Sequence, residues 1–375
     1  MKRRGDHEGT IYQRADGRWE ARVTVGFGAR RSFYGATRQE VVQKLREAQQ
    51  ALESGLPLGD GRQTTAQFLE SWLRAVEHRL RQSTWNRYCE YVALHIVPSL
   101  GQVRLTKLSP QHVQQFYAQK LSEGLSSTTV RHMHAVLHRA LVHAVKLGLV
   151  PHNVTDAVEA PRMRHAEIHP LSAAQARAFL EASRSERLHA LFVLALATGM
   201  RQGELLALRW QDVDLAHGAL QVRASLRYQV GKGFVFEEPK TKHGRRSVAL
   251  PPDAVEALQA HLARQEAERQ TLGRAWRDEG LAFASEVGGP IEATNMMRGS
   301  FHRVVERAGV PKIRFHDLRH TAATLLLGAR VNPKVVSEML GHSAISITLD
   351  IYAHVLPDMQ QDAATTMQWL LFPRE

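Results

Sequence analysis

The pattern of hydrophobic and polar positions changes its period along the chain and predicts three regions. In residues 1–57, short alternating segments are broken at Asp16-Gly17 and at later glycines, which indicates antiparallel strands joined by tight turns. The segment after Thr37 then takes a helical period, with Thr37 as its N-cap. We therefore expect a small module of three strands and one helix, which cannot bury a large core and is better suited to docking on a partner than to catalysis.

Residues 62–153 keep a helical period throughout. One helix is predicted to end at Pro98, and the next to begin with Ser109 as its N-cap and Pro110 at its first position. Apolar residues form a stripe along one side of the first and last segments, which predicts a compact four-helix domain. These stripes consist of Phe68, Leu69, Trp72, Leu73 and Val76, and of Val130, Met133, Leu137, Leu141 and Val145.

Residues 168–375 mix helices with strands. Residues 187–200 are apolar on every side, which is typical of a buried helix. Strands are predicted within residues 219–250, and a helix capped by Asn332 ends at Gly341. The predicted fold class is therefore multidomain, mainly α with α+β: a three-stranded sheet with one helix, a four-helix domain, and a mixed α/β domain.

Charge points to a polyanionic partner. The 375 residues carry a formal net charge of +12 and have a pI of about 10.1, a balance that favours nucleic acid. Residues 61–165 hold 13 Lys and Arg against 6 Asp and Glu, whereas residues 1–60 hold 11 against 8. The helical region is thus the best candidate for gripping a phosphate backbone, and an ordinary basic surface is the alternative.

The cysteine count and the hydropathy limit the class of protein. Cys89 stands alone, so the chain has no intramolecular disulfide, as expected in a reducing compartment. No window reaches the roughly 18 apolar residues of a membrane helix. The basic N-terminus lacks the apolar segment of a signal peptide, and we therefore expect a cytoplasmic protein.

Basic side chains in the first two regions are candidate DNA contacts. On the predicted sheet they could face DNA together with Trp19, or Trp19 could stabilise the fold beside solvated arginines. In the helical region these basic residues lie off the apolar stripes. Charges in such positions are usually only solvated, but the regional excess of Lys and Arg over Asp and Glu favours contact with DNA. The candidates are Arg22, Arg30, Arg31, Arg81, Arg87, Arg131, Arg139 and Lys146.

Four separated segments of the last region carry reactive side chains. In "TGMRQGELLALRW", Arg201 begins a helix, where its guanidinium is well placed to hold an oxyanion and Glu204 could orient it. Each segment alone also has an ordinary structural interpretation, such as a surface ion pair or a core residue. The other candidates, in "EEPKTKHGRRSVALP", "RFHDLRHTAATLLLG" and "LGHSAISITLDIYAHV", are Lys240, Lys242, His316, Arg319, His342 and Tyr352.

The spacing of His316 and His320 also fits a helical zinc pair. Two histidines four residues apart lie on one helix face, but a zinc hydrolase needs a third ligand and an activating carboxylate. The chain has no H-E-x-x-H motif, and His165, His169 or His342 could complete the ligand set only by coincidence. Arg319, between the pair, favours a bound anion instead.

Taken in order, the four segments resemble the tyrosine recombinase, or phage integrase, family. The matches are "TGMRQGEL", "PKTK", "HDLRH", "LGHS" and "DIYAH", and the resemblance covers roughly residues 62–370. It implies an arm-type DNA-binding module over residues 1–57, a core-site DNA-binding domain over residues 62–153, and a catalytic domain with a C-terminal tail over residues 168–375.

The resemblance implies a role for each candidate. Tyr352 attacks a DNA phosphodiester and forms a 3′-phosphotyrosyl link, while Arg201 and Arg319 hold the phosphate oxygens. His316 takes the tyrosine proton, Lys240 or Lys242 protonates the departing 5′-oxygen, and His342 donates a hydrogen bond to the phosphate or helps to position the site. The family requires neither metal nor other cofactor.

The resemblance also implies partners. We expect double-stranded DNA with core and arm sites, and a homotetramer that passes through a Holliday junction, at the bacterial nucleoid. A host DNA-bending protein and an excision factor are further candidate partners. A non-catalytic DNA-binding regulator and a type IB topoisomerase-like enzyme are the alternatives. The C-terminal tail ends in apolar residues that would form an exposed patch. This patch could dock on a neighbouring protomer or pack on its own chain.

Overall fold

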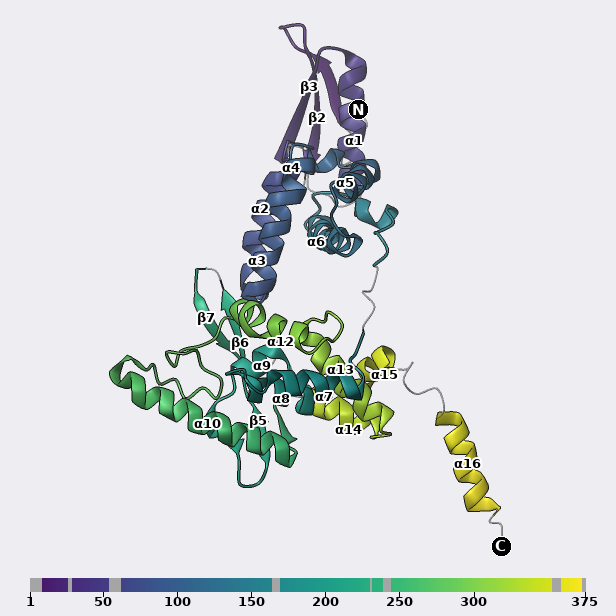
Figure 1. Cartoon of the computed structure of the whole chain (residues 1–375). Coiled ribbons are helices and arrows are strands. Elements are labelled where there is room, and N and C mark those ends of the chain that lie inside the picture. The colour runs from purple at the N-terminus through teal and green to yellow at the C-terminus, as the bar shows by residue number, and fades with distance from the viewer. Residues whose placement is uncertain are drawn as a thin grey trace. The chain divides into compact units, whose positions relative to one another are not determined.

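A computed structural model of the chain describes residues 9–25, 29–53, 62–163, 169–229, 231–238, 244–352 and 359–372. The chain divides into two compact units, residues 1–166 and 167–375 (Figure 1). The first unit contains two separate hydrophobic cores, and the second contains the largest. The finer division into three domains stays a prediction.

The N-terminal part of the first unit is the predicted sheet with one helix. Strands β1 (Thr10–Gln13), β2 (Trp19–Val25) and β3 (Ala29–Gly35) pair antiparallel in that order, and α1 (Arg38–Glu53) packs against them. The Thr37 hydroxyl accepts the Glu40 N–H at 3.2 Å, as expected of a helix N-cap. Trp19 is half-buried against the small core, which favours its fold-stabilising interpretation.

The rest of the first unit is helical, as predicted. The helices are α2 (Thr65–Val76), α3 (Gln82–Tyr91), α4 (Val97–Leu100), α5 (Pro110–Ser122) and α6 (Ser127–Lys146), with short turns at Glu77–Arg79, Leu105–Lys107 and Val154–Ala157. The predicted stripes are buried in its core, with Val76 and Val145 at the edge. Ser109 caps α5 and accepts the His112 N–H at 3.4 Å.

The prediction that a helix ends at Pro98 is wrong. Helix α3 continues through a π-helical turn, Val92–Ile96, into α4, so the helical run passes Pro98 and ends at Leu100. The Val97 N–H bonds to the Val92 carbonyl, five residues back. This wider turn accommodates a proline that has no N–H to donate, because the regular bonding pattern is already interrupted there.

The second unit is the predicted mixed α/β domain. Its helices are α7 (Ala173–Ser183), α8 (His189–Thr198), α9 (Gln202–Leu206), α10 (Pro252–Leu272), α11 (Ala293–Met296), α12 (His302–Arg307), α13 (Phe315–Gly328), α14 (Pro333–Leu340), α15 (Ile345–Tyr352) and α16 (Met359–Leu371). Strands β4 (Val213–Asp214), β5 (Ala219–Val222) and β8 (Arg246–Ala249) form one antiparallel sheet, and β6 (Ser225–Gln229) pairs with β7 (Gly233–Glu237).

Helix α8 is the centre of this unit, as its apolar sequence predicts. Both α10 and α13 pack against it. Phe192 of α8 meets Phe179, Phe301 and Phe315 with ring centroids 5.5–6.5 Å apart. These aromatic contacts fix α8 against its neighbouring elements, so the turn that follows α8 is held in a defined position.

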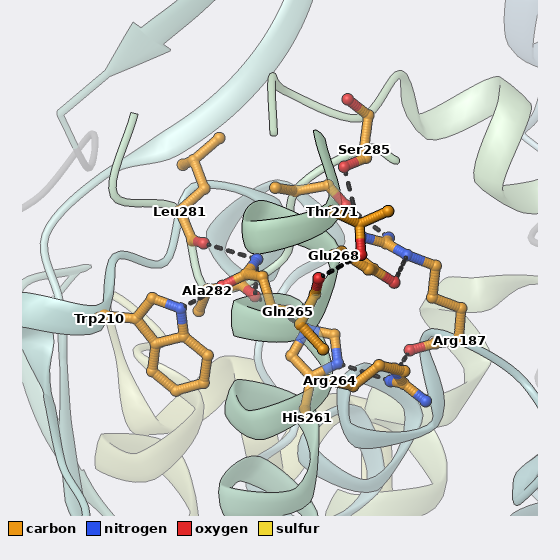
Figure 2. Close-up of polar contacts among 12 residues, drawn as sticks. Arg187, Trp210, His261, Arg264, Gln265, Glu268, Thr271, Leu281, Ala282 and Ser285 are labelled. Carbon is orange, nitrogen blue, oxygen red and sulfur yellow. Dashed lines mark hydrogen bonds and ion pairs between the residues drawn. The ribbon is translucent and has the colours of Figure 1, made fainter. Parts of the chain in front are cut away.

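A buried polar network fastens α10 to the segment 281–285 (Figure 2). Arg187 binds the Glu268 carboxylate at 2.8 and 2.5 Å and the Ala284 carbonyl at 2.7 Å. Burial, and then the charge of Arg264, lowers the pKa of His261 to about 4. The neutral ring therefore donates from Nε2 to the Ala282 carbonyl, 2.9 Å away, and its Nδ1 accepts from Arg264. The network supports the fold.

No helix within the described residues is long and apolar enough to cross a membrane.

Candidate active site

The turn after α8 positions Arg201. Helix α8 ends at Gly199, whose φ of 60° is left-handed, and Arg201 is the N-cap of α9. A Cβ on Gly199 would lie 2.4 Å from a Leu340 methyl, so only glycine fits between α8 and α14. The Gly199 carbonyl in turn accepts Arg319 Nη1 at 2.8 Å. One turn thus sets the positions of both arginines.

The end of α14 positions His342. Gly341 adopts a φ of 68°, its N–H bonds to the Glu338 carbonyl at 3.0 Å, and the His342 N–H bonds to the Ser337 carbonyl at 3.1 Å. This is a Schellman cap, the ending that the Leu-Gly-His sequence predicts. The cap directs the chain away from the helix at His342.

Glu204 lies between two guanidinium groups. Its carboxylate accepts Arg201 Nη1 at 2.8 Å, the Arg201 backbone N–H at 3.0 Å and Arg246 Nη2 at 2.9 Å. Burial alone would raise the pKa of Glu204, but the hydrogen bond and charge of Arg246 and the charge of Arg201 lower it. Glu204 is therefore an ionised carboxylate that holds two cations.

Both guanidinium groups also bind carbonyls at the C-terminal end of α14, one in its last turn and one in the residue that follows the helix. Arg201 Nη2 donates to the Gly341 carbonyl at 3.2 Å, and Arg246 Nε donates to the Met339 carbonyl at 2.6 Å. Terminal carbonyls have no partner inside a helix and carry partial negative charge, so cations suit them. These contacts tie α9 and β8 to the residues next to His342.

Helix α13 carries His316 and Arg319. Its N-terminus is fixed by Asp317, which accepts the Arg314 backbone N–H at 2.7 Å and the Arg314 guanidinium at 2.7 Å. Arg319 is 3% exposed, whereas His316 is exposed. The His316 and His320 rings meet edge-on with centroids 4.9 Å apart. Partial desolvation, followed by the charge of Arg319, lowers the pKa of His316.

His342 is held neutral. Burial, and then the charges of Arg319, Arg201 and Arg246, lowers its pKa to about 4. Its Nδ1 lies 2.7 Å from the hydroxyl of buried Thr348 in α15. With the Thr348 hydroxyl donating to Nδ1, the neutral ring carries its proton on Nε2 and can donate a hydrogen bond from there.

The structure thus brings Arg201, His316, Arg319 and His342 into one cluster, because the charges of Arg201 and Arg319 reach both histidines. Tyr352 is the last residue of α15, which packs against α13 and α14. The Tyr352 side chain, Lys240 and Lys242 lie outside the described residues. Arguments from sequence missed Arg246; the only signal for it was its place after the lysine segment, at the first position of β8.

The cluster is suited to an anion. The Glu204 carboxylate is shared by Arg201 and Arg246, Arg319 adds a third guanidinium that acts on both histidines, and both histidines have lowered pKa values. Within the described part of the chain, no three His, Cys, Asp or Glu side chains are grouped so that they could hold a metal ion. The pair His316 and His320 therefore gains no third ligand there.

The predicted DNA contacts lie on different surfaces. Arg22 alternates with the core residues Ala21 and Val23, so it faces away from α1, and Arg30 shares that face through its pairing with Thr24. Arg31 pairs with Val23 and therefore lies on the opposite face. In the helical region, the exposed candidates are Arg81, Arg87, Arg131, Arg139 and Lys146.

Several of these basic residues are anchored by neighbours. The Arg87 guanidinium lies 5.7 Å from the Tyr91 ring, and Arg139 donates to the Tyr88 hydroxyl at 3.2 Å. Arg22 binds Glu20 at 2.7 Å. Such contacts restrict the side chains without removing their charge from the surface.

Comparisons with known proteins agree with this geometry. The profile of the phage integrase family matches residues 161–359, and that of the phage integrase N-terminal SAM-like domain matches residues 64–122. A "Tyrosine recombinase XerC-like" protein of Caldanaerobacter subterraneus subsp. tengcongensis is 32% identical over 92% of this chain and 95% of its own. An "Integrase" of Streptomyces ambofaciens is 31% identical over 93% and 92%.

Solved structures share the fold. The integrase of transposon Tn1549, in complex with a circular intermediate DNA, superposes with a TM-score of 0.69 at 22% identity, over 81% of this chain and 99% of that one. The lambda integrase tetramer bound to a Holliday junction gives a TM-score of 0.58 at 20% identity, over 93% and 96%.

Proposed function

The chain belongs to the phage integrase family of tyrosine recombinases, and on that premise we propose that the cluster around Glu204 cuts and rejoins DNA through a 3′-phosphotyrosyl intermediate. The observation that carries the proposal is the excess of positive charge in the cluster. Arg201 and Arg246 share the Glu204 carboxylate, and the charge of Arg319 acts on His342 together with theirs, which leaves net positive charge for a phosphodiester. The enzyme acts as a site-specific recombinase of a mobile element.

Arg201 and Arg319 hold the non-bridging oxygens of the scissile phosphate. A guanidinium stays charged at any relevant pH and offers two parallel N–H groups to an anion. Arg201 is oriented by Glu204 and the Gly341 carbonyl, and Arg319 by the Gly199 carbonyl. Positive charge held in place in this way can stabilise the charge that develops on the phosphate during transfer.

The two histidines have different tasks. His316, whose lowered pKa leaves it unprotonated near neutral pH, accepts the proton of the attacking hydroxyl. His342 donates a hydrogen bond from Nε2 to a phosphate oxygen, since Nδ1 is engaged by Thr348. A free tyrosine has a pKa of about 10, so it needs such a base or a cationic pocket.

The transfer itself is assigned to Tyr352 and Lys240. The Tyr352 hydroxyl oxygen forms a bond to phosphorus while the bond from phosphorus to the 5′-oxygen breaks. The hydroxyl proton goes to His316, and Lys240, or Lys242 in its place, gives a proton to the 5′-oxygen. A second 5′-hydroxyl reverses these steps and joins a new strand, and the ester bond is conserved without metal or nucleotide.

Two regions outside the catalytic domain would hold DNA. We assign residues 1–57 to arm sites and residues 62–153 to core sites, through the exposed basic residues of each. Strand exchange between two duplexes needs four active sites, so a homotetramer passing through a Holliday junction is expected at the bacterial nucleoid, with a host bending protein and an excision factor as further partners. The lambda integrase tetramer on a Holliday junction supports this assembly.

Cleavage is expected to persist in EDTA. The test uses a nicked duplex that carries the junction sequence of the element encoding the chain, so that the cleaved strand loses its 5′-hydroxyl fragment and the covalent adduct accumulates. Adduct yield on a denaturing gel should be the same with and without chelator, because the proposed groups are all side chains. Cleavage that leaves no covalent adduct, is lost in EDTA and is restored by Zn²⁺ would instead establish the zinc hydrolase alternative.

Deleting residues 366–375 is expected to weaken assembly on DNA. Met367, Trp369, Leu370, Leu371 and Phe372 are 51–72% exposed at the end of α16. An apolar patch of this kind suits a second copy of the chain. Binding to a single core site should be unchanged, while cooperative binding to paired sites and synapsis, measured by gel shift, should be lost. Unchanged synapsis would show that the tail serves its own protomer.

A further inference from the structure

Arg246 is a buried guanidinium for which the steps above provide no role. Its side chain, at the first position of β8, is only 7% exposed. Besides its bonds to Glu204 and the Met339 carbonyl, its Nη1 donates to the Gly244 carbonyl at 3.3 Å. A cation that is removed from water this completely must be held by several partners.

Each partner of Arg246 belongs to, or lies next in sequence to, a different part of the candidate active site. Glu204 holds Arg201 through its side chain and its backbone N–H. Met339 belongs to the last turn of α14, three residues before His342. Gly244 directly follows the segment 239–243, which contains both candidate lysines. Arg246 is thus a shared anchor for three chain segments that are distant in sequence.

We propose that Arg246 is a positioning residue for strand cleavage, which sets the spacing between Arg201 and His342 by clamping Glu204 to the last turn of α14. The inference rests on the function proposed above. Arg246 contacts neither the phosphate nor the nucleophile in this role; it acts through Glu204 and through the carbonyl of Met339.

The chemistry of the clamp requires arginine. The planar guanidinium sends one N–H to a carbonyl and others to the Glu204 carboxylate at the same time. A lysine ammonium can satisfy one of these partners well, but it lacks the fixed fork. The clamp also places a cation at the C-terminal end of α14, where the helix dipole favours it.

Loss of the clamp changes what Glu204 does. Without Arg246, the buried carboxylate loses one of its two cations and binds Arg201 alone, which draws that guanidinium away from the phosphate. The Met339 carbonyl loses its partner at the same time, so the end of α14 and His342 are less fixed. Displacements well below 1 Å in such groups are enough to slow a reaction strongly.

The second unit offers a matched control in Arg187 (Figure 2). Arg187 is 22% exposed, binds the Glu268 carboxylate with two N–H groups and donates to a backbone carbonyl, as Arg246 does. Its partners are α10 and residues 284–285, away from α9, α13 and α14. Substitution of Arg187 therefore removes a comparable but less buried ion pair and none of the contacts of the proposed clamp.

The experiment compares Arg246→Met and Arg246→Lys with Arg187→Met and Arg187→Lys in the full chain. Single-turnover cleavage of the nicked junction duplex, the Kd for that duplex and the thermal midpoint are measured for each. We expect Arg246→Met to cleave about 10–100-fold more slowly at unchanged Kd, by analogy with residues that orient metal ligands. Arg246→Lys should lie between Arg246→Met and the parent, and the Arg187 variants should lose stability but cleave at the parental rate.

A double-mutant cycle adds a readout that a purely structural role would not move. Because Arg246 acts in part through Glu204, Glu204→Gln combined with Arg246→Met should reduce cleavage by less than the product of the two single reductions. Parental cleavage by Arg246→Met, or an equal loss in Arg187→Met, would overturn the proposal. If Arg246→Met does not fold, Arg246→Lys decides: a folded lysine variant that cleaves at the parental rate refutes the clamp.

The two proposals fail in different ways. Formation of a covalent adduct by the parent, and its dependence on Tyr352, tests the proposed function. The ratio of variant to parental cleavage rate tests the role of Arg246. An enzyme that forms the adduct but is indifferent to Arg246→Met leaves the first standing and removes the second.

Discussion

Tyr352→Phe is expected to bind the junction duplex with parental affinity and to form no covalent adduct. The substitution removes one oxygen, and that oxygen is the proposed nucleophile, so no other group can form the phosphotyrosyl bond. The rest of the cluster, including Arg201, Arg319 and His342, keeps its contacts to Gly199, Gly341 and Thr348. Binding and cleavage should therefore separate completely in this variant.

A matched control for Tyr352→Phe is available in the same unit. Tyr228 in β6 is 54% exposed and packs edge-on against Phe234, with ring centroids 5.4 Å apart. Tyr228→Phe removes the same atom from a residue outside the cluster and should leave the adduct yield unchanged. Adducts that form in Tyr352→Phe and disappear on mutation of another tyrosine would move the nucleophile to that residue.

Local signals in the sequence predicted much of the fold correctly. Ser109-Pro110, Asn332-Pro333 and Gly341 marked helix ends because capping depends on a few neighbouring residues. The segment 187–200, which is apolar on every side, predicted a buried helix because a helix without a polar face must be covered all round. Pro98 was misjudged, because the π-helical turn that lets the helix continue is formed by bonds whose pattern does not appear in residue types.

The candidate active site was predictable only in part. Arg201 and His342 stand in short motifs whose glycines set the turns, so the motif and the geometry coincide at Gly199 and Gly341. The role of the helix α14 carbonyls was not predictable, since Met339 and Gly341 bind arginines 93 and 140 residues away in sequence. Arg246 was overlooked for that reason, because its partners Glu204 and Met339 are brought to it only by tertiary packing.

The face of the first sheet that each candidate arginine occupies also could not be predicted from the sequence. The sequence placed Arg22, Arg30 and Arg31 on strands, but the pairing register decides which face each one occupies. Arg22 and Arg30 share the face that α1 leaves open, whereas Arg31 pairs with core residue Val23. A DNA contact by the open face would therefore use Arg22 and Arg30.

Arg201→Lys is expected to reduce the rate of cleavage by about 10²–10³-fold, by analogy with the loss of an oxyanion-hole donor. The lysine ammonium keeps the positive charge but lacks the planar set of N–H donors of a guanidinium. In the native site those donors also bind Glu204 and the Gly341 carbonyl. A lysine that satisfies Glu204 has no fixed second donor for the phosphate. Affinity for DNA should change little, because many other basic residues contribute to it.

The control for Arg201→Lys is Arg314→Lys, which has nearly the same local geometry. Arg314 is also a helix N-cap, at the start of α13, and it also binds the buried carboxylate three residues on, Asp317, at 2.7 Å. Both substitutions therefore weaken a capping ion pair at a helix start, and both should lower the thermal midpoint to a similar degree. Arg201→Lys should slow cleavage far more than Arg314→Lys in single-turnover assays, because Arg201 also binds the end of α14, whereas Arg314 fixes only the start of α13. Equal losses of cleavage in the two variants would mean that the rate depends on helix capping and not on a guanidinium held against the phosphate.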